Sequence, residues 1–137
     1  MYSRIMVPVD LAHAERLSKA ITAAADLARL YAIPICFVAV TAETPTEVAH
    51  TPDEFAAKLQ AFGTAQAESL GLSVTTAAYP SHDPAIDLDK TLIAAAKENG
   101  CDLIVMASHV PGLPEHIFAS NAGAVASHAG ISVFVVR

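Results

Sequence analysis

The sequence has only two cysteines and few charged residues, and it lacks tryptophan. The first two scarcities each exclude a class of protein. Two cysteines without a C-x-x-C pair cannot form a disulfide framework. Cys36 lies in the apolar run "IPICFVAV", where we expect a buried small side chain, and Cys101 lies at a helix-to-strand turn. Charged residues make up 16% and hydrophobic residues 53%, which excludes a disordered chain and favours a packed core.

Long apolar runs are also missing, and so is an excess of positive charge. No window reaches the ~18 apolar residues that a membrane-spanning helix needs. The net charge of -6 lacks the basic footprint of a nucleic-acid-binding protein. We therefore expect a cytoplasmic protein with no membrane insertion and no nucleic-acid partner. Backbone N–H groups at a helix end could still bind the phosphate of a small molecule.

Short runs rich in valine and isoleucine alternate with amphipathic stretches along the whole chain. This order predicts a doubly wound, five-stranded, mostly parallel α/β sheet of Rossmann-like type, with helices on both faces, in a single domain over residues 1–137. The expected strands cover residues 4–9, 34–40, 72–80, 102–108 and 131–137, and the expected helices cover residues 13–32, 51–71, 81–100 and 120–130.

Three segments should meet at the carboxyl ends of these strands, where sheets of this kind bind ligands. They are the end of the first strand with Pro8, Val9 and Asp10, the end of the second strand with Val40, and the long loop after the fourth strand. Asp10 has two interpretations, which are compatible: an acceptor for a ligand's base or sugar, and an N-cap for the first helix.

The loop from Ala107 to Ser120 is longer than most strand-to-helix connections. Ser120 and Asn121 are expected to open the last helix, where free N–H groups and the helix dipole favour an anion, although Ser120 could simply cap that helix. The six histidines show no metal-ligand spacing, so we expect no metal site. No catalytic constellation is recognisable, since the chain has no G-x-S-x-G elbow.

The segments "RIMVPVD", "CDLIVMASH" and "ASNAGAVASHAGISVFVVR" resemble the universal stress protein family, and the resemblance extends over the whole chain. It implies ATP binding, with Asp10 and Val40 framing adenine and ribose and the 107–121 loop holding the phosphates. It also implies a homodimer that pairs through the final strand, residues 131–137. A transporter or an enzyme would be the regulated partner.

The glycines of the family's phosphate-binding motif are replaced in this chain. Ala107 and Val110 occupy the first two glycine positions, and Ala119-Ser120 replaces the closing pair after a spacing one residue shorter than the family's. A shortened loop that closes with "SNA" is similar to one bacterial subgroup. Alanine keeps the N–H donor, whereas a β-branched valine resists positive φ, so Gly112 could supply the flexible point instead.

Three functions therefore remain open from the sequence. The first is a regulatory domain that binds ATP, with or without magnesium, or AMP. AMP is a candidate because the loop contains no lysine or arginine, which leaves backbone N–H groups, His109 and His116 to face the phosphates. The second is an interaction protein that binds no nucleotide. The third is a slow ATP hydrolase that uses His109 and Asp10.

Overall fold

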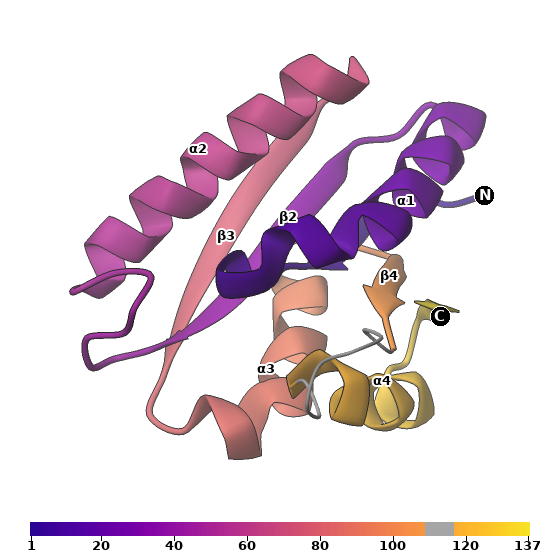
Figure 1. Cartoon of the computed structure of the whole chain (residues 1–137). Coiled ribbons are helices and arrows are strands. Elements are labelled where there is room, and N and C mark those ends of the chain that lie inside the picture. The colour runs from indigo at the N-terminus through magenta and orange to yellow at the C-terminus, as the bar shows by residue number, and fades with distance from the viewer. Residues whose placement is uncertain (109–116) are drawn as a thin grey trace.

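The computed structural model describes residues 1–108 and 117–137, and these form one parallel five-stranded sheet (Figure 1). The strands are β1 (Ile5–Pro8), β2 (Ile35–Ala42), β3 (Val74–Ser81), β4 (Leu103–Ala107) and β5 (Ser132–Val136). Their order is β3-β2-β1-β4-β5, and each neighbouring pair is parallel. The predicted fold class is confirmed. No helix in the described ranges is long and apolar enough to cross a membrane.

Side chains of the central strands alternate between two separate cores, one on each face of the sheet. Ile5 and Val7 of β1 belong to the first core, and Met6 between them belongs to the second. β2 and β4 alternate in the same way, with Phe37 in the first core and Cys36 in the second. Successive strand residues point to opposite faces, so a continuous apolar run needs cover on both sides.

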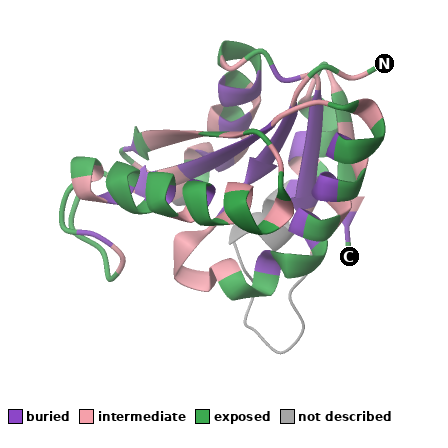
Figure 2. Cartoon of the chain, turned by 90° about the horizontal axis from the view of Figure 1, so that it is seen from above, coloured by how far each residue is buried: buried purple, intermediate pink, exposed green. Residues whose placement is uncertain are grey.

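Four α-helices provide that cover (Figures 1 and 2). α1 (Ser18–Tyr31) and α2 (Pro52–Leu70) contribute buried residues to the first core, and α3 (Pro84–Glu98) and α4 (Ile117–His128) contribute to the second. Alanines make up much of the buried face of α1, among them Ala20, Ala24 and Ala28. Their small side chains let the helix approach the sheet closely.

Both ends of α2 agree with the helix expected over residues 51–71. The Thr51 hydroxyl accepts a hydrogen bond from the Glu54 N–H at 3.1 Å, which caps the start of α2, and Pro52 is its first residue. Gly71 ends α2 with φ of 66°, a left-handed conformation that glycine adopts without steric cost.

Two predicted helix starts were wrong. The first helix does not run uninterrupted from residue 13, because a 3-10 helix (Leu11–Leu17) precedes α1 and His13 has non-helical angles inside it. The last helix was expected to begin at Ser120, but α4 begins at Ile117, so Ser120 lies inside the helix instead of capping it. A helix tolerates isoleucine and phenylalanine, so it can begin before Ser120, at Ile117 and Phe118. Ser120 was therefore a misleading signal for the start of the helix.

Gly63 lets α2 pack closely against β3. A Cβ atom at this buried position would lie 2.4 Å from Cγ2 of Thr76, whereas a Cβ at Gly123 on α4 would meet nothing within 4 Å. Both glycines lie inside helices, so they share the same helix-propensity penalty but differ in the space around them.

We predict that Gly63→Ala lowers the free energy of unfolding by about 1 kcal/mol, because overpacking outweighs the gain in helix propensity. Gly123→Ala, the matched control, should raise it by about 0.5–1 kcal/mol. Urea unfolding measures both values. In the Thr76→Ala background the clashing methyl group is gone, so Gly63→Ala should become neutral or stabilising there; an equal loss in both backgrounds would contradict the steric explanation.

Candidate functional site

The strand order reverses between β1 and β4, and this reversal determines where a ligand can bind. The chain passes from β1 outward to β2 and β3, and then returns to the other side of β1 as β4 and β5. Connections on the two sides therefore diverge at the carboxyl ends of β1 and β4, where doubly wound sheets leave a crevice. Asp10 follows β1 and Ser108 follows β4, so both lie at this edge.

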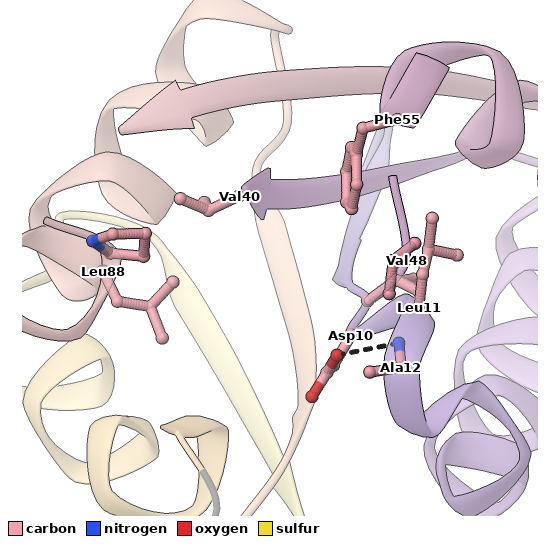
Figure 3. A pocket seen from close by; sticks show the side chains of 9 residues that line it. Asp10, Leu11, Ala12, Val40, Val48, Phe55 and Leu88 are labelled. Carbon is pink, nitrogen blue, oxygen red and sulfur yellow. Dashed lines mark hydrogen bonds between the residues drawn. The ribbon is translucent and has the colours of Figure 1, made fainter. Parts of the chain in front are cut away.

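A cavity of about 90 Å³ opens beside the end of β1. Figure 3 shows Val40 and Leu88 on one side of it, Leu11, Val48 and Phe55 on the other, and Asp10 at its border. The complete lining is Val9, Asp10, Leu11, Ala12, Val40, Val48, Phe55, Pro84 and Leu88. Apart from the Asp10 carboxylate, every lining side chain is apolar. This volume is well below the roughly 300–1,000 Å³ of a complete small-molecule site, so the cavity suits one flat apolar group.

The Asp10 carboxylate is held in place by the chain that follows it. Its Oδ1 atom accepts a hydrogen bond from the Ala12 N–H at 3.0 Å, which caps the 3-10 helix (Figure 3). Its Oδ2 atom lies 3.0 Å from Nδ1 of His13. The N-cap interpretation is thus confirmed. These two contacts fix the orientation of the Asp10 carboxylate at the end of β1.

Ser108 presents a buried hydroxyl at the end of β4. Its Oγ atom has no hydrogen-bond partner among the described residues, while its N–H donates to the Val136 carbonyl oxygen at 2.9 Å. Buried hydroxyls are nearly always paired, because an unpaired one costs roughly 1–3 kcal/mol. A polar ligand at this edge would supply a partner that the described residues do not.

The structure brings together part of the predicted site. Val9, Asp10 and Val40 line the cavity, whereas Pro8 is buried in β1 and does not line it. Ala107 ends β4 outside the lining. Ala119, Ser120 and Asn121 lie in α4. His109, Val110 and Gly112 lie outside the described residues, so their predicted contacts with a phosphate stay predictions.

Several cavity residues were not predicted. Leu11, Val48, Phe55, Pro84 and Leu88 come from the connections after β1, β2 and β3 and from the starts of α2 and α3. Phe55 lies within the expected helix over residues 51–71 but was not predicted to reach the site. A helix that follows a strand must begin near that strand's carboxyl end, so apolar residues in its first turns were the available signal.

The histidines and cysteines that the structure describes form no second site at this edge. Within residues 1–108 and 117–137, no group of three or more histidine, cysteine, aspartate or glutamate residues could hold a metal ion. Cys36 and Cys101 are both buried and unbridged, as expected for Cys36. The neighbouring Cys36 side chain and burial raise the pKa of the Cys101 thiol, which keeps that thiol protonated.

Comparison with known proteins identifies one family. A sequence model of the universal stress protein family matches residues 1–137. The fold is similar to a universal stress protein from Archaeoglobus fulgidus, with 19% identity, complete coverage of both chains and a TM-score of 0.71. The universal stress protein from the same organism in complex with dAMP has 19% identity, and the match covers 99% of this chain and 98% of that protein with a TM-score of 0.67. A universal stress protein in complex with cAMP has 15% identity, coverages of 99% and 97%, and a TM-score of 0.70.

The double role of Asp10 leads to a prediction about stability. Asp10→Ala removes the cap of the 3-10 helix and should lower the free energy of unfolding by about 1 kcal/mol in urea titrations. Asp10→Asn keeps an oxygen that accepts from the Ala12 N–H, so its loss should stay within about 0.5 kcal/mol. If Asn were as destabilising as Ala, the pairing with His13 would matter more than the cap.

Proposed function

The chain belongs to the universal stress protein family, and on that premise we propose that it binds an adenine nucleotide at the carboxyl end of the sheet and regulates a partner as a homodimer in the cytoplasm. It acts by binding and not by turnover. The observation that carries this proposal is the apolar cavity beside Asp10, with a Ser108 hydroxyl at the same edge that has no hydrogen-bond partner among the residues described by the structure.

The cavity suits the base of the nucleotide. Val40 and Leu88 lie opposite Val48 and Leu11, so a planar ring between them would contact methyl groups on both sides (Figure 3). Asp10 at the border offers carboxylate oxygens to a ribose hydroxyl or a base amino group. In the described part of the site, these are the groups that would distinguish a nucleoside from a simple phosphate.

The phosphate would extend toward the end of β4. Ser108 can donate a hydrogen bond to a phosphate oxygen, and backbone N–H groups of the loop after Ala107 would add to it, as the sequence predicts. That loop has no lysine or arginine, and the chain carries a net charge of -6. A monophosphate is therefore easier to accommodate than a triphosphate, whose extra charge would need a cation such as Mg²⁺. This favours AMP over free ATP.

Homodimer formation follows from the exposed edge at β5. This strand lies at one end of the sheet, so one side of its backbone has no neighbouring strand. Ser132 and Phe134 on it are exposed, Phe134 to 47%. Proteins usually cover an apolar edge strand, and pairing with the same strand of a second copy would cover both.

Nucleotide binding is tested by calorimetry with AMP, ATP and ATP with magnesium. AMP should bind at least as tightly as ATP without magnesium, and magnesium should strengthen ATP binding. Ser108→Ala should weaken AMP roughly 10- to 100-fold, as expected for a hydrogen bond to a charged group, whereas Ser127→Ala on the exposed face of α4 should leave it unchanged. Val40→Trp should fill the cavity with its larger side chain and thereby prevent the binding of AMP.

Absence of heat with every nucleotide at millimolar concentration, in a protein that unfolds cooperatively, would contradict the proposal. It would favour the alternative of an interaction protein that binds no nucleotide. Release of phosphate from ATP that is lost in His109→Ala would instead support slow hydrolysis.

The dimer is tested by sedimentation velocity. Phe134→Lys places a charge on the exposed edge and should convert the dimer to a monomer. Leu30→Lys, at a site that is 73% exposed on α1, should leave the dimer intact. A wild-type chain that sediments as a monomer at all concentrations would refute pairing through residues 131–137.

A further inference from the structure

A second and larger hollow lies at the opposite end of the sheet. It is a groove open to solvent with a volume of about 660 Å³, within the roughly 300–1,000 Å³ of small-molecule sites. Its lining comes from the outer face of α3, from the turn before β4 and from the turn before β5, namely Lys90, Ile93, Ala94, Lys97, Gly100, Cys101, Gly130 and Ile131. We call the hollow with this lining the groove. Because the two turns precede β4 and β5, the groove lies at the amino end of the sheet, away from the carboxyl-end cavity.

Apart from the two lysines, the residues that line the groove are apolar or small. Ile93 and Ile131 are half-buried, so part of each side chain faces the open space, and Ala94 is exposed between the two lysines. The thiol of Cys101 is buried at 5% exposure, and its raised pKa leaves it uncharged. An aliphatic chain that covers these side chains would remove apolar surface from water on both partners.

Positive charge is concentrated at this groove. The chain has four lysines, and two of them, Lys90 and Lys97, line it, while no acidic residue of the described chain does. Neither ammonium forms an ion pair with a carboxylate in residues 1–108 and 117–137, whereas Lys58 on α2 does so with Glu54. Lys90 and Lys97 are seven positions apart, about 10 Å along the helix, so both lie on one face.

Helix electrostatics explain only one of these lysines. Lys97 lies in the last turn of α3, where a cation offsets the negative end of the helix dipole. Lys90 lies two turns earlier, beyond the reach of that effect. Its positive charge beside an apolar groove, on a chain of net charge -6, is complementary to an anion with an apolar body.

We propose that this groove binds a small amphipathic anion, a carboxylate with an aliphatic tail. The tail lies along Ile93, Ala94 and Ile131, and the carboxylate lies next to Lys90 or Lys97. This site is independent of the proposed nucleotide site, because the two linings share no residue. The chain would then have two ligand sites, at the two ends of its sheet.

Octanoate and octanol, which contain the same number of carbon atoms but differ in charge, test the proposal by NMR titration of the isoleucine methyl groups. Octanoate should shift the Ile93 and Ile131 resonances saturably, and octanol should bind several-fold more weakly. Hexanoate should also bind roughly tenfold more weakly, because each buried methylene contributes up to about fourfold in affinity. AMP should leave both resonances unchanged.

Variants at exposed positions separate the charge effect from folding. Lys90→Ala should weaken octanoate roughly 2- to 5-fold, and Lys90→Arg should retain the wild-type affinity. Lys19→Ala, which removes the same charge outside the groove, is the control and should have no effect. Ala94→Glu should weaken octanoate and Ala94→Lys should strengthen it, with the cooperative unfolding transition preserved in both.

Three results would overturn the proposal. One is the absence of saturable shifts, and another is equal binding of octanoate and octanol. The third is a shift of Ile93, which lies in α3 outside the proposed dimer strand, on protein dilution alone, because the occupant of the groove would then be a second copy of the chain. Failure of nucleotide binding would leave these outcomes unaffected, so the two proposals can fail separately.

Discussion

Two-sided burial of the central strands is the constraint on which the rest of the structure depends. β1 and β4 lie inside the sheet, so their side chains alternate between two cores, and helices must cover both faces. The chain meets this requirement by winding outward from β1 through β2 and β3 and then returning to form β4 and β5. That return separates the connections after β1 and β4, and the end of β1 with its cavity therefore lies beside the end of β4 with the Ser108 hydroxyl.

The same winding gives the two ends of the sheet different chemistry. At the carboxyl end, strand ends and helix starts bring together Asp10, the Ser108 hydroxyl and a small apolar cavity, which suits a flat base attached to a polar group. At the amino end, the last turns of α3 and the turns before β4 and β5 leave an apolar groove with two lysines. The start of α3 lines the cavity and its later turns line the groove, but the two linings share no residue, so binding at one end does not obstruct the other.

Sequence patterns predicted the architecture because the governing signals are local and repeated. Five apolar runs, amphipathic spacing and caps such as Thr51 and Gly71 each agree with the fold. The site was predicted only in part. Val9, Asp10 and Val40 end strands or follow them directly, so topology alone places them at the cavity. Phe55 and Leu88 reach it through the packing of α2 and α3, and Val48 through the connection before α2, which spacing along the chain does not reveal. The early start of α4 at Ile117 was missed because Ser120 is a typical capping residue.

The central claim is that the base of an adenine nucleotide occupies the cavity beside Asp10, and it is tested most directly by methyl NMR with valine- and leucine-labelled protein during AMP titration. The account predicts saturable shifts at Val9, Val40, Val48 and Leu88, which line the cavity, and none at Val133 in β5 or Val125 in α4. Shifts that are absent at saturating AMP, or that are confined to α4 and β5, would contradict it.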